Sequence, residues 1–311
     1  MQFTFGMMED QERRKKATML DEVAKIIDFG RMEKPLSAMY KYGGRPPIPP
    51  LMLFKALLLE SWYGLSDVEV VQEIHDRRSF ERFIGPDVRK YHLDDTTLVK
   101  FRNRLRETGT LAKVWGEVDR ALSARKLVVK KGVIVDSTLV EGACRPESKR
   151  EDGSPVDEDA GYTARKGQTY CGYKVHVGMD KVSGIIRRMG LSRIEEHDHE
   201  HFKGLIPRGT KEAYADKAYR SIEHDEYLEK RGMKNRILFK GYRNRKLTGR
   251  QKRLNRAWSK VRSIIEPKMN DLKRWCSMGR MRYYGLERNG VWMLVCGLAA
   301  NFKRTVTLCS A

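Results

Sequence analysis

The chain has 311 residues, of which 40% are hydrophobic and 33% are charged. This balance is typical of a globular protein with a substantial core and excludes an intrinsically disordered chain. The 62 lysines and arginines outnumber the 41 aspartates and glutamates, and the resulting net charge of +21 favours a polyanionic partner such as nucleic acid.

Cysteine usage and hydropathy indicate the compartment. Five scattered cysteines show no CxxC spacing, so neither a zinc site nor a dithiol redox motif is expected. Residues 1–14 lack the apolar segment of a signal peptide, and the longest apolar run, 291–300, is about half the length that spans a bilayer. We therefore expect a cytoplasmic protein with free thiols, a buried helix at 291–300 and no membrane contact.

The first part of the chain, residues 1–127, is predicted to form an all-α domain. Apolar side chains recur at helical spacing in 19–27 and 111–125, and the run 51–63 is apolar nearly all round, as in a central helix. A helix over 96–108 carries the basic residues Lys100, Arg102 and Arg104. They predict either a DNA-contacting helix or a solvated face, and the sequence leaves both interpretations open.

The pattern changes near residue 128, where strands begin. Three strands joined by hairpin-like turns are followed by alternating helix and strand, which predicts a mixed five-stranded sheet flanked by helices over residues 128–311. The expected strands are 131–139, 173–179, 185–194, 212–216 and 236–240. The polar stretch 141–172 is too long for an ordinary hairpin loop, and either ordering on a nucleic acid or plain disorder explains it.

A second unusual stretch, 227–256, is strongly basic. It contains 12 lysines and arginines and a single acidic residue, Glu229, with Phe239 and Tyr242 among the cations. Such a run is often only a solvated surface, but next to an active site it favours phosphate contact. The residues that we expect to bind DNA here are Lys240, Arg243, Arg245, Lys246, Arg250, Lys252 and Arg253.

Three carboxylates form the candidate catalytic site. Asp136 ends the β-branched run 133–135, Asp216 ends the short strand-like run 212–215, and Glu266 lies on a predicted helix. Two aspartates at strand ends and a helical glutamate can together bind a pair of Mg²⁺ ions, which activate a nucleophile and stabilise the leaving oxygen in phosphodiester chemistry. We expect all three to be metal ligands, with Mn²⁺ able to replace Mg²⁺.

Basic side chains are predicted to surround these carboxylates. Arg262 and Lys273 share a helical face with Glu266, which suits contacts to a DNA backbone; an exposed helix with i,i+4 charge pairs is the alternative. Lys174 and His176 alternate along the second strand and could approach the site from one of its sides.

Several motifs, taken together, resemble a known family. Asp136-Ser-Thr, Tyr-Ala-Asp216-Lys-Ala-Tyr and Arg262-x₃-Glu266-x₆-Lys273 are similar to the DDE transposases of bacterial insertion sequences, and most similar to insertion-sequence family five. The resemblance extends over most of the chain. Further matching segments are Tyr63-Gly-Leu-Ser-Asp, Asp95-Thr-Thr-Leu-x-x-Phe-Arg, Gly172-Tyr-Lys-Val-His176, His197-Asp198 and Tyr284-Gly-Leu-x-Arg-Asn289.

The resemblance implies an RNase H-like catalytic domain that uses Asp136, Asp216 and Glu266 for Mg²⁺-dependent 3′-end cleavage and strand transfer. It also implies recognition of terminal inverted repeats, target DNA as a second partner, a nucleoid location and a homodimer that brings two ends together. Two alternatives remain: a catalytically inert DNA-binding repressor derived from a transposase, and a nuclease that does not transpose.

The chain departs from the motif of the related family four in two places. Ser259 stands where that motif has a tyrosine, so a stacking role at this position is not expected. Pro267 follows Glu266 directly, and because proline disfavours helical backbone in its predecessor, we expect a kink at the glutamate.

Overall fold

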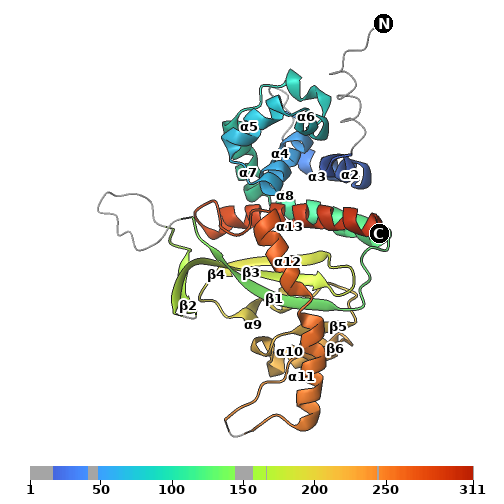
Figure 1. The fold of residues 1–311 in the computed structure, drawn as a ribbon, viewed down its shortest axis with the longest axis vertical. Helices are drawn as coiled ribbons and strands as arrows, with labels where there is room; N and C mark the ends of the chain where they lie inside the picture. Colours follow the sequence, from blue (N-terminus) through green and yellow to red (C-terminus); the bar gives the residue numbers. More distant parts are fainter. Residues whose placement is uncertain (1–16, 41–47, 144–156, 166, 244, 311) are drawn as a thin grey trace, which may run out of the picture.

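The computed structural model describes residues 17–40, 48–143, 157–165, 167–243 and 245–310. Its N-terminal part is helical, as predicted, and lies at one end of the molecule (Figure 1). The helices are α2 (Met19–Ile26), α3 (Gly30–Ser37), α4 (Pro50–Tyr63), α5 (Asp67–Asp76), α6 (Arg78–Ile84), the 3₁₀ turn η1 (Pro86–Lys90), α7 (Asp95–Thr108) and α8 (Thr110–Ala124).

Local sequence signals explain where these helices begin and which of them is central. Ser66 and Glu69 form a capping box at the start of α5, and the Asp94 side chain accepts a hydrogen bond from the Thr97 amide at the start of α7. The apolar helix α4 is buried over almost its whole surface, which confirms the prediction of a central helix.

The second part of the chain contains a mixed sheet of six strands. The strands are β1 (Val133–Glu141), β2 (Gly161–Arg165), β3 (Gln168–Asp180), β4 (Ile186–Arg193), β5 (Glu212–Ala215) and β6 (Lys234–Ile237). β3 is antiparallel to β1 and β4, whereas β5 is parallel to β1 and β6 is parallel to β5. The order β4-β3-β1-β5-β6 with these directions is that of an RNase H-like fold.

The sixth strand corrects the prediction of five. β2 lies inside the stretch 141–172 that was expected to be a loop, and it pairs with the first residues of β3, from Gln168 to Gly172. The extended β3 therefore continues beyond the predicted 173–179, and the same edge of β3 then pairs with β4. The middle of the stretch, 144–156, lies outside the described residues.

Helices cover both faces of the sheet. One face carries Val133, Val135 and Ala213. It packs against Phe202, between the short helix α9 (Asp198–His201) and η2 (Lys203–Leu205), and against Leu228 of α10 (Ile222–Lys230). The other face carries Ile134, Val175 and Val177 and belongs to a larger cluster shared with the N-terminal helices. Helices α11 (Gly249–Arg262), α12 (Ile265–Trp275) and α13 (Leu286–Cys309) complete the chain.

The last helix, α13, connects the sheet to the helical part. It lies between them in Figure 1, and the Asn301 side chain forms hydrogen bonds of 2.8 Å with both the amide and the carbonyl of Ile186 on β4. On its other side the Trp62 indole donates a hydrogen bond to the Ala299 carbonyl. The predicted buried helix at 291–300 is confirmed, and the core is continuous across residue 127, where the domain boundary stays a prediction.

Within the described part of the chain, no helix combines the length and the apolar character that crossing a membrane requires.

Candidate active site at the carboxyl ends of β1 and β5

Asp136 and Asp216 lie where two neighbouring parallel strands separate. β1 pairs with β5 only through Val133 and Ile134, so Asp136 lies beyond the last paired residue, and Asp216 follows the end of β5 at Ala215. Because side chains alternate along a strand, Asp136 lies on the same face as Ile134 and opposite to Val135. This is the face that α11 and α12 cover, as required for Glu266 to approach.

Arg262 joins the first aspartate to the glutamate. At the end of α11 its guanidinium donates a hydrogen bond of 2.7 Å to Oδ2 of Asp136, and its second terminal nitrogen is 3.6 Å from Oε1 of Glu266. The other oxygen of Asp136 accepts the Ser137 amide at 3.0 Å. Glu266 lies nearer the surface than Asp136: the side chain of Glu266 is 60% exposed, and that of Asp136 is 19% exposed.

The kink expected at Pro267 is present, and it lies just before the glutamate. The chain leaves helix α11 after Arg262, passes through Ser263 and Ile264, and begins α12 at Ile265. Pro267 is therefore in the first turn of α12, where an amide N–H has no intrahelical partner and proline costs little. The break sets Glu266 at the start of its own helix.

Burial and like charges act on Asp136. Burial raises the pKa of its carboxyl above the usual value, and the nearby charges of Asp216 and Asp198 raise it further, whereas Arg262 and the Ser137 amide lower it. The pKa of Asp136 is raised overall, so the Arg262 guanidinium and the Ser137 amide do not fully compensate for burial and for the repulsion by the other carboxylates. Asp216 is thus close enough for its charge to act on Asp136.

This donor set fits a divalent cation. Carboxylate oxygens are the ligands that Mg²⁺ prefers, and a cationic group, the Arg262 guanidinium, already bridges Asp136 and Glu266. Among the residues that the structure describes, no three His, Cys, Asp or Glu side chains lie close enough together to hold a metal ion.

Lys174 and His176 lie on the opposite face of the sheet. Their strand partners are Leu139 and Ser137, which alternate with the Asp136 side. Lys174 donates to the Glu196 carbonyl at 2.7 Å and is 3.1 Å from Asp198, while Nε2 of the fully buried His176 is 2.9 Å from the Ser192 hydroxyl. Burial, and then the neighbouring His201, lower the pKa of His176 to about 3, so its ring is neutral at neutral pH.

Two polar residues of this region were not predicted from the sequence. Asp198 faces Lys174 from α9, and Tyr219, which is 1% exposed, lies near Ser137 in the turn after Asp216. The His197-Asp198 and Asp216-Lys-Ala-Tyr motifs contained both residues, but nothing in those motifs indicates that they approach Asp136.

The predicted DNA-binding residues fall into two groups. Lys174, Arg262 and Lys273 are half-buried and already paired; Lys273 donates to the Leu139 carbonyl at 2.7 Å. The remaining ones, apart from Arg102, are exposed: Lys100, Arg104, Lys240, Arg243, Arg245, Lys246, Arg250, Lys252 and Arg253.

Arg102 is the correction among them. Its side chain is 9% exposed and forms two hydrogen bonds with the Asp67 carboxylate, and it is 3.5 Å from the buried Glu60. The charge is directed inward because α4 and α5 place both acidic residues beneath α7. Arg102 therefore stabilises the packing of three helices and is not among the DNA contacts that we propose.

Two neighbouring hollows open near the end of β1. An open groove of about 1070 Å³ is lined by residues of α5, by Glu141 at the end of β1 and by Lys273, Arg280 and Arg282. A smaller hollow of about 340 Å³ shares Glu141, Lys273 and Gly279 with this groove and reaches Thr138 on β1, two residues from Asp136. The two hollows together extend from Thr138 on β1 to α5 in the helical part, and none of the three predicted catalytic carboxylates lines either of them.

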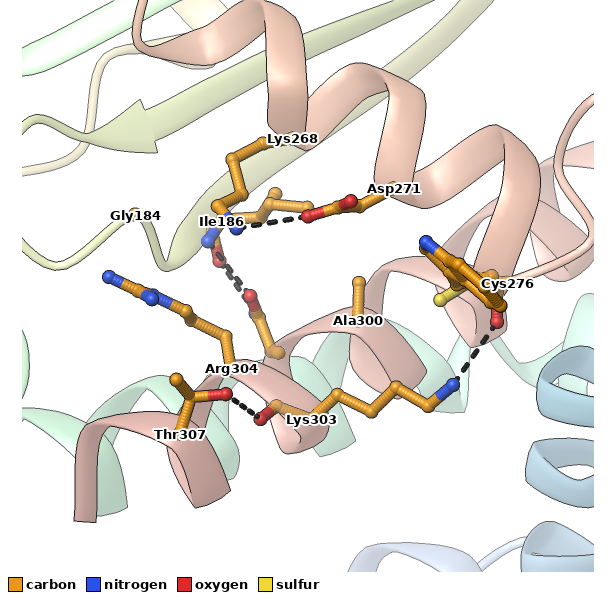
Figure 2. Close-up of a pocket in the computed structure, with 11 residues that line it drawn as sticks. Gly184, Ile186, Lys268, Asp271, Cys276, Ala300, Lys303, Arg304 and Thr307 are labelled. Carbon is orange, nitrogen blue, oxygen red and sulfur yellow. Dashed lines mark hydrogen bonds and ion pairs between the residues drawn. The ribbon is translucent and has the colours of Figure 1, made fainter. Parts of the chain in front are cut away.

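A separate pocket of about 160 Å³ lies between α12 and α13, away from the carboxylates (Figure 2). Its cations are already engaged: Lys268 pairs with Asp271 at 2.9 Å, and Arg304 donates to the Ser183 carbonyl at 2.7 Å. No predicted catalytic residue lines it, so we do not assign the reaction to this pocket.

Two family models match this chain, one in its helical part and one over the sheet-containing part. Residues 8–104 match the family model "Transposase domain (DUF772)", and residues 129–302 match the model "Transposase DDE domain". Among solved structures, the chain is similar to the piggyBac transposase in a synaptic complex with hairpin DNA, determined by cryo-EM, with 11% identity and a TM-score of 0.42 over 94% of this chain and 73% of that one. Since the DDE model covers more than half of its length, the chain belongs to the family of transposases with a DDE domain, whose function is DNA transposition.

Proposed function

We propose that this protein is the transposase of a bacterial insertion sequence, related to insertion-sequence family five. It would bind the terminal inverted repeats of its element, cleave at the 3′ ends and join them to target DNA. One observation carries the proposal: Asp136 and Asp216 emerge together where β1 and β5 separate, and Arg262 links Asp136 to Glu266. A DNA-binding protein without catalysis has no need for this arrangement of mutually repelling carboxylates.

Asp136, Asp216 and Glu266 would hold Mg²⁺, with Mn²⁺ as a substitute. When bound, the metal would activate water or a 3′-hydroxyl and stabilise the leaving oxygen. The strand ends fix the two aspartates, while the break before α12 sets Glu266 opposite to them. Arg262, released from Asp136 as the metal binds, would be free to contact the phosphate at the cleaved position.

The DNA would contact two surfaces. On one side, the groove with Lys273 and Arg280 would guide the DNA from the end of β1 to α5, and the exposed Lys100 and Arg104 of α7 would add contacts in the helical part. At the other end of the molecule, the exposed cations between Lys240 and Arg253 lie before and along the first turns of α11 (Figure 1). The transposon end and the target DNA would thus each bind one of these two basic surfaces. We further propose a homodimer, because joining two ends requires both to be held in one complex.

The test is cleavage and strand transfer on a labelled duplex that carries the element's end, read from the DNA flanking the gene. Wild type should yield Mg²⁺-dependent 3′-end nicks and joined products, whereas Asp136→Ala, Asp216→Ala and Glu266→Ala should not. Asp271→Asn is the matched control, because this carboxylate lies on the same helix as Glu266 and, among the residues that the structure describes, forms an ion pair only with Lys268. It should cleave as wild type does.

Other outcomes select the alternatives. Equal cleavage by wild type and Asp136→Ala would reject the catalytic assignment. Specific end binding without any Mg²⁺-dependent product would indicate a DNA-binding repressor, and nicks without strand transfer would indicate a nuclease.

A further inference from the structure

The pocket between α12 and α13 has the size of a single aromatic ring. Its volume is about 160 Å³, and an engineered apolar cavity of about 150 Å³ holds one molecule of benzene. Three parts of the chain form its walls: the turn at Gly184, helix α12 and helix α13. Two hydrogen bonds of 2.8 Å between the Asn301 side chain and the backbone of Ile186 fix the wall between α13 and β4. The hollow is therefore part of the packed structure.

Trp275 presents an indole ring to this pocket. It lines the pocket and is 60% exposed, whereas the other four tryptophans, Trp62, Trp115, Trp258 and Trp292, are at most 8% exposed. Tryptophan is highly buried on average, and it is enriched where proteins bind their partners. An indole that the fold leaves uncovered beside a ring-sized hollow can stack on a second flat ring.

Two cations of α13 have binding capacity left at this pocket. Lys303 is half-buried, and its one hydrogen bond to the described residues is a long contact of 3.5 Å with the Trp275 carbonyl. Arg304 donates from Nε to the Ser183 carbonyl, while its two terminal nitrogens have no hydrogen-bond partner in the described part of the chain. Partly enclosed charges of this kind gain from an anion, because water no longer solvates them fully.

The pocket as a whole carries a surplus of positive charge. Lys268 and Asp271 of α12 form an ion pair of 2.9 Å, and it is the one ion pair among the described residues that line the pocket. The charges of Lys303 and Arg304 are therefore not neutralised by a carboxylate of the pocket. Figure 2 shows these two side chains leaving α13 in opposite directions, with Ala300 between them. An anion that enters the pocket thus meets a cation on either side.

The pocket lies across α12 from the candidate active site. Lys268 follows Glu266 by two residues and Trp275 follows Lys273 by two, and two residues correspond to about half a turn of an α-helix. Lys268 and Trp275 therefore face the pocket on one side of α12, while Glu266 and Lys273 lie on the other. The helix itself separates a ligand in this pocket from the proposed metal site.

We propose that this pocket binds a small molecule that consists of one aromatic ring and one anionic group, either a carboxylate or a phosphate. The ring stacks on the indole of Trp275, and the anionic group pairs with Lys303 or Arg304. The inference goes beyond the proposed function and does not rest on it, because neither DNA nor a metal ion takes part in this binding.

The experiment follows the tryptophans of the full chain by ¹⁹F NMR after labelling with 5-fluorotryptophan. Trp275→Phe identifies the Trp275 signal. Phenyl phosphate or benzoate, at a salt concentration of about 0.15 M, should shift this signal alone and to saturation, with a Kd of about 1 mM or below. Whichever of the two binds more tightly identifies the anionic group. Benzyl alcohol lacks the charge and inorganic phosphate lacks the ring, so neither should saturate the shift in the same concentration range.

Variants separate the pocket from the general attraction of a basic protein for anions. Lys303→Gln or Arg304→Gln should weaken binding of the tighter probe about tenfold, as expected for a lost charged hydrogen bond. Ala300→Leu fills the hollow without changing the charge, so it should abolish binding. Arg288→Gln is the matched control, because it removes the same charge from an exposed position of α13 that does not line the pocket. Thermal unfolding confirms that each variant is folded.

The outcomes that would overturn the inference are distinct from those that test catalysis. The absence of a saturable shift with both ring-bearing anions would reject it, and so would equal binding by Ala300→Leu and wild type. An oligonucleotide that shifts the Trp275 signal as strongly as phenyl phosphate would assign the pocket to the DNA-binding surface instead. Glu266→Ala should bind the probe as wild type does, so a failure of the proposed catalytic site would leave this inference in place.

Discussion

Asp136 carries its carboxylate in surroundings that disfavour the charged form. Its carboxylate is mostly enclosed, near the charges of Asp216 and Asp198, and its pKa is raised despite the contact with Arg262. A charge in such surroundings destabilises the fold until a cation neutralises it. Functional groups are often held in this way, at the expense of stability.

Asp136→Asn should therefore raise the melting temperature in EDTA, because the amide keeps the shape of the side chain and removes the charge. In wild type, Mg²⁺ at a hundred times its Kd should add about 2.7 kcal/mol to the free energy of unfolding, whereas the variant should gain little. Differential scanning calorimetry with and without Mg²⁺ checks both effects. Asp271→Asn should behave as wild type, and an equal Mg²⁺-dependent rise in Asp136→Asn would contradict the assignment.

Glu60 is a second enclosed carboxylate, in the interior of the helical part. It is completely buried on α4, and neither of its oxygens has a hydrogen-bond partner, although Arg102 and Arg282 lie 3.5 and 3.9 Å away. Burial raises the pKa of Glu60 to about 8, with Asp67 adding to the effect and the two arginines opposing it. The folded state thus binds this proton more tightly than the unfolded chain, whose glutamate has its ordinary pKa of 4.5.

The free energy of unfolding should fall as the pH rises from about 5 to about 8, because the folded state carries more protons in this window. The contribution of Glu60 is at most about 1.4 kcal/mol per pH unit. Glu60→Gln should flatten the profile in urea titrations, and Glu107→Gln, at an exposed position of α7, should not. A slope that is the same in Glu60→Gln and wild type would show that another group is responsible.

At the scale of elements, the α11 region combines an exposed basic surface with a helix end that contacts Asp136. The exposed cations precede the helix or lie in its first turns, while Arg262 at its last residue contacts Asp136. A single helix therefore links the proposed DNA backbone contact to the proposed metal site.

Replacing Arg243, Arg245 and Lys246 by glutamine should reduce the slope of log K against log[salt] for DNA binding by about two to three, since each lost phosphate contact removes roughly 0.9. The control replaces Lys131, Lys211 and Lys234, which are exposed at the opposite, amino-terminal ends of β1, β5 and β6. Fluorescence anisotropy across a salt series measures both slopes. An unchanged slope in the first variant would mean that these residues do not touch phosphate.

The elements that could be predicted from the sequence are those with a strong local signal. Composition and spacing predict the β-branched strand before Asp136 and the apolar helix α4. Pro267 likewise predicts an interruption of the helix, which lies just before Glu266. β2 was missed because a five-residue strand is stabilised by its pairing with β3, not by its own residues.

The contacts of individual side chains were harder to predict, because they too depend on residues that are distant in the sequence. Arg102 has the sequence context of an exposed helix face, and only the distant residues Glu60 and Asp67 direct it inward. Asp198 is likewise 24 positions from Lys174 along the chain, and only the folded sheet with α9 beside it brings the two side chains within 3.1 Å of each other.

At the scale of the whole molecule, α13 is the element on which both parts depend. Gly297 lies where this helix crosses the sheet, and a Cβ atom at this position would overlap Met189 on β4 and the indole of Trp115 on α8. The absence of a side chain therefore allows α13, α8 and β4 to meet.

Gly297→Ala should destabilise the protein by about 1–3 kcal/mol, the usual effect of overpacking a core. Gly290→Ala, on the same helix with no atom near its Cβ position, should stabilise it by roughly 0.5–1 kcal/mol, because alanine favours helix over glycine. Urea unfolding of both variants gives the comparison. Effects of the same sign would contradict the close approach at Gly297.

The position of α13 has a consequence for the order of synthesis. Its residues Ala299 and Phe302 contact Trp62 and Phe29, so helices made first on the ribosome stay incompletely packed until the end of this chain has emerged. A product that ends before Leu286 would expose the apolar surface of α4 and become a substrate for proteolysis. A prematurely terminated product would thus be removed instead of accumulating.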